Sequence, residues 1–245
     1  MTQQTSRLSG LVTPRPALRT TPVTRIRSTL PIPETQIPLN GVGEQVRVAV
    51  EFVMVAGLFL VSFPVILASI LMVRLTSRGP GIYTQTRVGI NGRVFTFYKI
   101  RTMYHNCESQ TGPRWSPPGD PRITPIGRIV RKLHLDELPQ LWNVLRGDMS
   151  LIGPRPERPE IVARLRQSVP GYDRRHAVKP GITGFAQINL PPDTCIRSVK
   201  NKVVYDLFYI RHRTVGMELY IVFATGLKLL GMKHLYQRKP RIPTE

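Results

Sequence analysis

FVMVAGLFLVSFPVILASILMV, residues 52–73, is an uncharged apolar stretch bounded by Glu51 and Arg74. As a straight helix it is about 33 Å long, because each residue adds about 1.5 Å, and this length matches a bilayer core of about 30 Å. The stretch therefore predicts a helix embedded in a membrane, and the rest of the chain has to be arranged around it.

Two features of this segment argue against a straight crossing. Pro64 lies near its middle and cannot donate a backbone hydrogen bond, so the helix should kink there, with Ser62 placed to bond a freed carbonyl oxygen. Both flanks are basic, with Arg47 on one side and Arg74 on the other, whereas a crossing helix keeps its basic residues on the cytoplasmic side. We therefore expect residues 44–78 to form a re-entrant helix hairpin with both ends cytoplasmic. A kinked spanning helix and a buried helix of a soluble domain are the alternatives.

The composition predicts anionic partners. Lys and Arg number 35 against 15 acids among 245 residues, for a formal charge of +20, which favours nucleic acid, acidic lipid head groups or phosphorylated small molecules. The hydrophobic content of 41% is enough for one domain with a sizeable core. Cys107 and Cys195 lie far apart, so they indicate no disulfide framework, and the five histidines show no metal-ligand spacing.

The chain divides into three parts. Residues 1–43 are rich in Thr, Pro, Ser and Arg, have Glu34 as their first acid, and are predicted to be a disordered basic tail without a secretory signal. The membrane segment, residues 44–78, follows. Residues 79–240 are expected to form a cytoplasmic catalytic domain. The predicted fold class is mixed α/β, mainly helical, with a small β-hairpin and interfacial amphipathic helices.

The expected elements of this domain follow from local patterns. IYTQTRVGINGRVFTFYKIRTM, residues 82–103, predicts two strands joined at Asn91-Gly92. GMELYIVFATGLKLLGMKHLYQRK, residues 216–239, fits a helix at a membrane interface or, equally well, a core helix. IGRIVRKLHL, residues 126–135, predicts an amphipathic helix. Its expected inward residues are Ile126, Ile129, Val130 and Leu133, and its expected outward residues are Arg128, Arg131 and Lys132.

HLDELPQLWNVL, residues 134–145, places two carboxylates side by side, Asp136 and Glu137. Asp136 would suit the N-cap of the following helix, which is the structural alternative to a chemical role. Adjacent helical residues point about 100° apart, so the two acids do not oppose each other as a glycosidase pair does. Crowded by Arg128 and Arg131, the carboxylates should stay ionised, and an ionised Asp is suited to attack phosphorus or to bind Mg²⁺.

Three basic or glycine-bearing motifs accompany this pair. GDMSLIGPRPERPE, residues 147–160, holds Arg155 between two prolines, a stiff loop that offers a guanidinium to a phosphate. In YKIRTM, residues 98–103, Lys99 and Arg101 alternate on one strand face, and VKPGITGFAQIN, residues 178–189, contains a turn that could approach a ligand. Each motif alone is more often structural, but their combination beside a membrane segment indicates a phosphate-handling site.

With these motifs the chain resembles the monotopic phosphoglycosyl transferases, also called bacterial sugar transferases, from about Val46 to Lys239. The resemblance implies a membrane enzyme that moves a sugar 1-phosphate from a UDP-sugar to polyprenyl (undecaprenyl) phosphate, giving polyprenyl-diphosphate-sugar and UMP. Such a reaction is a first membrane step of a glycoconjugate or exopolysaccharide pathway. The motifs that carry it are SRGPGIYTQTRVG, YKIRTM, GRIVRKLHLDELPQLWNVLRGDMSLIGPRPE, PGITGFAQIN and YDLFYI.

The resemblance also implies residue roles. Asp136 is the expected nucleophile, forming a covalent aspartyl-phosphosugar intermediate, with Glu137 beside it and Mg²⁺ bound by both. Whether Glu137 binds metal or acts as a base is left open. The chain departs from the family pattern at Phe63, which separates Ser62 from Pro64 at the expected membrane break, and at Ile100. The expected substrate and phosphate contacts are Lys99, Arg101, Arg128, Arg131, Arg155, Gln187 and Asp206.

The expected location is the bacterial inner membrane, with the catalytic domain on its cytoplasmic face. The implied partners are a UDP-sugar, polyprenyl phosphate and inner-membrane lipids, with a homodimer left open; nucleic acid is not expected, because aromatic residues make up 7% and no nucleic-acid module is recognised. The alternative function is a non-catalytic, basic membrane-surface protein that binds anionic lipids, which would not need the acid pair. The loop at residues 190–202 is expected to influence which sugar is used.

Overall fold

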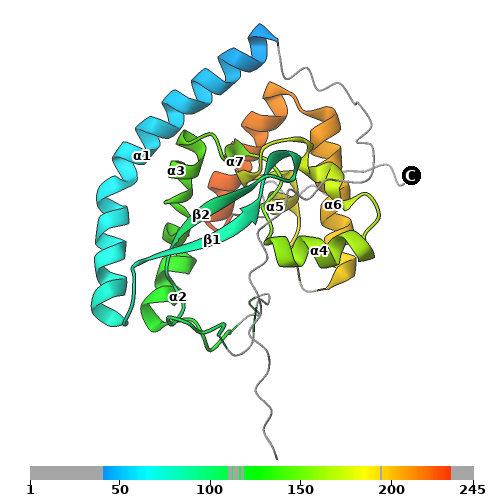
Figure 1. Ribbon diagram of the computed structural model, residues 1–245. Coiled ribbons are helices and arrows are strands. Elements are labelled where there is room, and N and C mark those ends of the chain that lie inside the picture. The colour runs from blue at the N-terminus through cyan, green and yellow to red at the C-terminus, as the bar shows by residue number, and fades with distance from the viewer. Residues whose placement is uncertain (1–40, 110–111, 113–115, 117–118, 194, 233–245) are drawn as a thin grey trace, which may run out of the picture.

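The computed structural model describes residues 41–109, 112, 116, 119–193 and 195–232. The predicted basic tail lies outside these residues except for its last three, as do residues 233–240 of the predicted catalytic domain. The described part is mixed α/β and mainly helical, as predicted. In Figure 1 the long helix α1 lies along one side of the remaining elements. These are β1 (Ile82–Val88), β2 (Val94–Ile100), α2 (Pro125–Lys132), α3 (Gln140–Leu145), β3 (Ser150–Ile152), α4 (Pro159–Ser168), β4 (Gly181–Thr183), α5 (Phe185–Asn189), α6 (Ile196–His212) and α7 (Val215–Leu229), with short 3-10 turns η1 (Ile90–Gly92), η2 (Leu135–Glu137) and η3 (Tyr172–Ala177).

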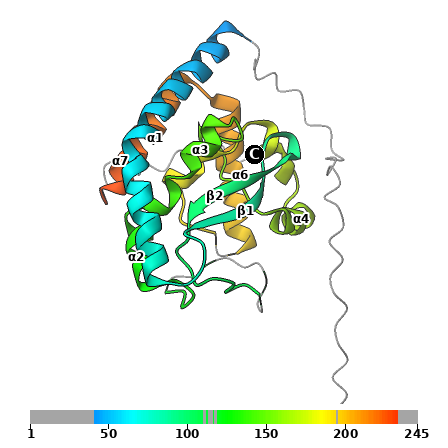
Figure 2. The ribbon, with the colours of Figure 1, turned by 60° about the vertical axis from the view of Figure 1, so that its left-hand side comes forward.

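Helix α1 runs from Val42 to Thr76 and is, within the described residues, the one helix long and apolar enough to cross a membrane. It bends near its middle and lies as a separate layer beside the domain (Figures 1 and 2). Most of its apolar side chains are exposed, with Leu60 at 72% and Val61 at 78%. A core helix of a soluble domain would bury such residues, so that alternative is wrong. That both ends lie on one side of a membrane stays a prediction.

Pro64 and Ser62 lie inside α1, and the helix continues through them. Pro64 leaves the carbonyl of Leu60 without its usual donor, because the proline nitrogen carries no hydrogen. The Ser62 hydroxyl donates instead to the carbonyl oxygen of Phe59, at 3.2 Å. Ser62 therefore bonds a different carbonyl oxygen from the one that Pro64 leaves without a donor, and the predicted bond from Ser62 to the freed carbonyl is wrong.

The hairpin of β1 and β2 is confirmed. The strands pair in antiparallel register, with Tyr83 opposite Lys99. Asn91 and Gly92 have φ values of 52° and 73°, the left-handed conformations that a tight connection requires and that Asn and Gly tolerate best. The hairpin therefore fixes which face of β2 presents Lys99.

Helix α2 is present, but its inward face differs from the prediction. Val130 is buried, whereas Ile129 and Leu133 are 55% and 59% exposed and Arg131 is half-buried. The reason is Gly127, because a β-carbon at this position would come within 2.1 Å of the Thr102 carbonyl oxygen. The missing side chain lets α2 approach that backbone, and the close approach turns the face of Gly127, Val130 and Arg131 inward.

Strands β3 and β4 form a parallel pair at the centre of the domain, with Ser150 opposite Gly181 and Ile152 opposite Thr183. Helices α5, α6 and α7 pack around this pair. Three glycines make the approach possible: Gly153, Gly181 and Gly184, each of which would place a β-carbon within 2.4 Å of backbone. The resulting core contains Ile152, Val178, Phe185, Ile188, Tyr209, Ile210, Ile221 and Ala224.

A network of ion pairs ties the first turns of α1 to the start of α7. Arg47 lies 2.7 Å from Glu44, 3.5 Å from Glu51 and 3.6 Å from Glu218, while Arg213 lies 2.8 Å from Glu218 and 3.3 Å from Glu44. The Glu51 carboxylate also accepts hydrogen bonds from the Ser150 hydroxyl, at 2.6 Å, and from the amide of Leu151 in β3. The long helix is thereby fastened to the core strands by polar contacts at its N-terminal end.

Two glycine substitutions test the close packing of β3 and β4. Gly181→Ala should lower the free energy of unfolding by about 3 kcal/mol, because the added methyl group meets backbone that cannot move alone. Gly226→Ala is the matched control: it lies in α7 with open space at the added methyl group, and should stabilise by about 0.5–1 kcal/mol. Thermal unfolding of both variants in detergent checks the pair, and equal melting temperatures would contradict it.

Candidate active site

Asp136 and Glu137 lie in the turn η2 between α2 and α3. His134, with φ of 55°, reverses the chain after α2 and begins this turn. Asp136 is 7% exposed. The N-cap of α3 is Pro139, and no side chain caps that helix, so the structural alternative for Asp136, a helix N-cap, is wrong. Both acids stand on a tight turn whose direction is set by α2 on one side and α3 on the other.

Two cations from distant parts of the chain contact the acid pair. Lys99 of β2 places its Nζ 2.9 Å from Oε1 of Glu137 and 3.4 Å from Oδ2 of Asp136. Arg155 places Nη2 2.6 Å from the same Oε1 of Glu137. Burial by itself would raise the pKa of the Glu137 carboxyl, but Arg155 and Lys99 outweigh it and hold this pKa well below its usual range. Glu137 is therefore ionised, as predicted, although its cations are not Arg128 and Arg131.

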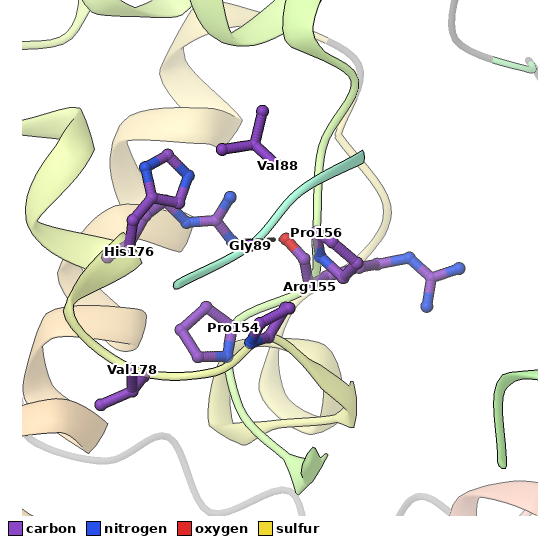
Figure 3. Close-up of a pocket in the computed structure, with 9 residues that line it drawn as sticks. Val88, Gly89, Pro154, Arg155, Pro156, His176 and Val178 are labelled. Carbon is purple, nitrogen blue, oxygen red and sulfur yellow. Dashed lines mark hydrogen bonds between the residues drawn. The ribbon is translucent and has the colours of Figure 1, made fainter. Parts of the chain in front are cut away.

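Arg155 is held by its backbone, which leaves its side chain directed at the pair. Its carbonyl oxygen accepts a hydrogen bond from Nη2 of Arg175 at 2.9 Å. Figure 3 shows this bond and shows the guanidinium of Arg155 extending away from His176 and Val178, which lie on the other side of the loop. A small pocket lies at this loop. It is lined by Val88, Gly89, Pro154, Arg155, Pro156, Arg175, His176, Val178 and Pro180.

Asp206 supports this loop from a distance and does not contact the pair. Its carboxylate binds Nε and Nη2 of Arg175 at 2.9 and 2.7 Å, and both side chains are almost completely buried. Burial raises the pKa of Asp206, and the charge of Arg175 opposes that shift. Asp206 thus orients Arg175, which in turn holds the carbonyl of Arg155.

A second buried ion-pair cluster, centred on Glu157, was not predicted from the sequence. The segment 190–202, predicted as a loop, is helical from Ile196 onward, where α6 begins. Lys202 of α6 lies 2.7 Å from Glu157 and 2.8 Å from Asp193, which precedes α6, and Arg87 of β1 lies 3.5 Å from Glu157. The signal was present, because Lys202 falls at a core position of α6 beside Val203. A charged residue on a buried helix face needs a partner. The cluster joins the segment after Arg155 to the first part of α6 and to Asp193 before it.

The remaining predicted residues are not bonded to the pair. Arg101 donates to the carbonyl oxygens of Ser77 and Arg78, at 2.8 and 2.5 Å, and so caps the C-terminal end of α1. Arg128 is exposed on α2, and Gln187 donates to the carbonyl of Ile182 at 2.8 Å. Arg131 donates a hydrogen bond to the Thr102 hydroxyl at 2.7 Å. Burial lowers the pKa of Arg131, and the negative charge of Asp136 opposes that shift, so Arg131 is close enough to interact electrostatically with Asp136.

Asn143, which sequence reasoning also missed, docks α3 onto the hairpin. It is completely buried; its Oδ1 accepts from the amide of Tyr98 at 3.2 Å and its Nδ2 donates to the carbonyl of Thr96 at 2.7 Å. These bonds align α3 with β2. They therefore set the position of Lys99 relative to η2.

The acid pair fits Mg²⁺ by its donor set. Among the described residues there is no group of three or more His, Cys, Asp or Glu that would hold a metal alone. Protein-bound Mg²⁺ is commonly held by one or two carboxylates, with substrate phosphates and water completing its six ligands. Asp136 and Glu137 supply two adjacent carboxylates, which suits an ion that arrives with a diphosphate.

Comparison with known proteins gives a consistent result. The family model described as bacterial sugar transferase matches residues 42–232. A protein of Aeromonas hydrophila, named UDP-N-acetylgalactosamine-undecaprenyl-phosphate N-acetylgalactosaminephosphotransferase, is 42% identical over 162 residues, 66% of this chain and 38% of its own length. A UDP-glucose:undecaprenyl-phosphate glucose-1-phosphate transferase of Escherichia coli (strain K12) is 40% identical over 208 residues, 84% of this chain and 44% of its own.

The chain thus spans less than half the length of these two relatives. A third relative is closer in size: a UDP-glucose:undecaprenyl-phosphate glucose-1-phosphate transferase of Caulobacter vibrioides, 38% identical over 202 residues, which are 81% of this chain and 75% of that protein. In all three the similarity includes most of the region that carries the acid pair and its cations here.

The Glu157 cluster generates a pH-dependent prediction. Burial would raise the pKa of Glu157, but Lys202 and Arg87 lower it from 4.5 to about 2. Because the folded pKa is the lower one, the stabilisation is complete above pH 4.5 and is lost as the pH falls toward 2. Glu157→Gln should cost about 3 kcal/mol of unfolding free energy at neutral pH, and this difference from the natural protein should shrink below pH 4.5.

Denaturant unfolding at a series of pH values measures the effect. Glu160→Gln is the matched control, because the Glu160 side chain is 59% exposed and should give no difference at any pH. A cost for Glu157→Gln that is the same at pH 3 and pH 7 would contradict the assignment.

Proposed function

The chain belongs to the bacterial sugar transferase family, and we propose that it transfers a hexose 1-phosphate from a UDP-sugar to undecaprenyl phosphate, releasing UMP, through a covalent phosphosugar on Asp136. The contact of Lys99 and Arg155 with Glu137, next to Asp136, is the observation that carries the proposal. Two cations converge on a site that already holds two acids, and this arrangement suits a substrate that brings several phosphate charges.

The reaction we propose has two displacements at one phosphorus. A carboxylate oxygen of Asp136 attacks the phosphorus that bears the sugar, the bond from that phosphorus to the bridging oxygen breaks, and UMP leaves with the electron pair. A phosphate oxygen of the lipid then attacks the same phosphorus and releases the Asp136 carboxylate. Lys99 and Arg155 lie where they would bind the phosphate oxygens, and because they are already oriented they lower the barrier without further reorganisation.

Asp136 and Glu137 would hold Mg²⁺, which would neutralise part of the diphosphate charge when bound. Glu137 keeps its negative charge at neutral pH because Arg155 and Lys99 stabilise it. It is therefore suited to bind a cation and unsuited to give up a proton as an acid. The two ion pairs reduce the basicity of Glu137 and therefore disfavour the role of base. Both ion pairs are made by Oε1, so Oε2 would be the oxygen that binds the metal.

The exposed apolar surface of α1 supports association with a membrane, where a lipid acceptor would be found. Helix α7 adds exposed Leu219 and Phe223 on its outer side. We place the protein in the bacterial inner membrane, with the catalytic domain on the cytoplasmic face where nucleotide sugars are available, as part of a glycoconjugate or exopolysaccharide pathway. Inner-membrane lipids stay predicted partners, and a homodimer stays open. The names of the relatives include both glucose and N-acetylgalactosamine, so the proposed donor class is a UDP-hexose, a term that here includes the 2-acetamido derivatives.

The aspartyl intermediate is tested with Asp136→Asn. Incubated with UDP-hexose and Mg²⁺ but no lipid, the natural protein should gain the mass of one hexose phosphate on the peptide containing Asp136 and should exchange labelled UMP into UDP-hexose. The variant should do neither and should lose turnover by at least about 10⁴-fold, because an amide does not form the mixed anhydride. Glu160→Gln, an exposed acid on α4, should leave both reactions unchanged.

If the lipid phosphate attacks directly in a ternary complex, the opposite results are expected. Without lipid there is then no adduct and no exchange of UMP, and steady-state double-reciprocal plots for UDP-hexose at several lipid concentrations intersect instead of running parallel. A basic lipid-binding protein would show neither turnover nor adduct with any of a panel of UDP-sugars.

Topology is tested by cysteine labelling in intact cells. Gln45 and Arg78 are exposed residues on either side of the apolar part of α1. With Cys107 and Cys195 replaced by serine, Gln45→Cys and Arg78→Cys should both be protected from a membrane-impermeant reagent and both react after lysis. Labelling of one position alone in intact cells would show that α1 crosses the membrane.

A further inference from the structure

Gln140, the first residue of α3, is completely buried, and neither its amide nitrogen nor its amide oxygen has a hydrogen-bond partner among the described residues. Leaving a buried amide unpaired is unfavourable, and most buried polar side chains in folded proteins are satisfied. Asn143, one turn further along the same helix and equally buried, has both amide atoms bonded to β2. The contrast marks Gln140 as a group whose partner is something other than the neighbouring protein.

The position of Gln140 identifies where that partner lies. It follows Asp136 by four residues and Glu137 by three, and Leu138 and Pro139 between them have helical backbone angles. Side chains on a helix lean toward its N-terminus, and residues three or four apart are neighbours on its surface. The side chain of Gln140 is therefore directed back toward the acid pair.

Contacts on either side of Gln140 support this placement. Toward the N-terminus, Asp136 meets Lys99 of β2, at 3.4 Å; toward the C-terminus, Asn143 meets the amide of Tyr98 in the same strand, at 3.2 Å. Gln140 lies between these two contacts along the chain, on the side of η2 and α3 that faces the strand. The amide of Gln140 is thus directed toward the side on which a group attached to the carboxylate of Asp136 would lie.

The chemistry of the unpaired amide defines the ligand class. An amide donates through nitrogen and accepts through oxygen. A phosphosugar offers phosphoryl oxygens that accept and sugar hydroxyl groups that donate, so one ligand satisfies both halves of the side chain. Because both amide atoms are unpaired, this match does not depend on which of them is assigned as nitrogen.

We propose that Gln140 is a catalytic residue that donates a hydrogen bond from its amide to a non-bridging oxygen of the phosphosugar attached to Asp136. This inference rests on the proposed function, because it requires the covalent intermediate. While the Asp136 oxygen bonds to phosphorus and UMP departs with the bridging oxygen, negative charge on the non-bridging oxygens is met by the amide donor. Because the amide is completely buried in the free protein, the side chains around it must move apart for the phosphosugar to reach it, and the amide gains its partner when Asp136 is loaded.

Three variants test the proposal. Gln140→Met keeps the length and volume of the side chain and removes the amide; Gln140→Glu keeps the shape and replaces the donor with a charge that repels phosphate. Asn143→Leu is the matched control for a buried amide with a structural role. For each protein we would measure the melting temperature without substrate, and the rate at which UDP-hexose and Mg²⁺ without lipid add the hexose phosphate mass.

Gln140→Met should slow formation of the adduct about 10²-fold, the usual effect of removing one oriented donor, while its melting temperature stays equal to or rises above that of the natural protein. Gln140→Glu should be slower still. Asn143→Leu should lower the melting temperature by several degrees, because it leaves the amide of Tyr98 and the carbonyl of Thr96 without partners.

The opposite movement of stability and rate is the signature of the proposed role. A structural role for Gln140 predicts that Gln140→Met lowers the melting temperature, as Asn143→Leu does, and that result overturns the proposal. So does adduct formation by Gln140→Met within threefold of the natural rate. If the natural protein itself forms no adduct and exchanges no UMP, the proposed function fails and this inference fails with it, a result distinct from a failure confined to Gln140.

Discussion

The structure depends on keeping a partly buried carboxylate charged. Glu137 is ionised because Lys99 and Arg155 meet at one of its oxygens, and these two cations come from separate parts of the chain. A buried ion pair is favourable only when its geometry is fixed and its remaining groups are satisfied. The hairpin, the central strand pair and the helices around them all contribute to that geometry. Arg175, in particular, holds the backbone of Arg155 and is itself held by Asp206.

This requirement changes how the formal charge of +20 should be interpreted. The sequence suggests a basic shell waiting for phosphates, but several of the arginines are internal fasteners. Arg175 is almost completely buried, Arg101 caps the long helix through two carbonyl oxygens, and Arg122 is buried against Asp120 at 2.5 Å. The guanidinium group suits this task because it presents five donors in a rigid plane. These three arginines are therefore not available to bind a ligand, although the composition counts them among its basic residues.

The elements that sequence patterns predicted well are those with a local cause. The length of the uncharged apolar stretch predicts α1. Asn91-Gly92 predicts the hairpin, because Asn and Gly adopt the left-handed backbone conformation more readily than other residues do. The inward face of α2 was missed because it is set by a distant carbonyl that Gly127 allows to approach. Asp136 and Glu137 are adjacent in the sequence and lie together in η2, whereas Arg101 shares the motif YKIRTM with Lys99 but holds the end of α1. Asp206, in the motif YDLFYI, binds Arg175 and does not contact the acid pair. Membership of a motif does not distinguish a residue that touches a ligand from one that positions it.

Both ends of α1 are fastened to the same rigid body, by ion pairs near Glu44 and Arg47 at one end and by Arg101 at the other. Because α1 is bent and held at both ends, its curvature depends on these two sets of contacts and on any force that acts on its middle. When that middle lies in lipid, lateral pressure and bilayer thickness act on the bend. Arg101, which holds this end of α1, and Lys99, which contacts the acid pair, are two residues apart in the chain. A change in the bend of α1 would therefore act on the segment that positions Lys99.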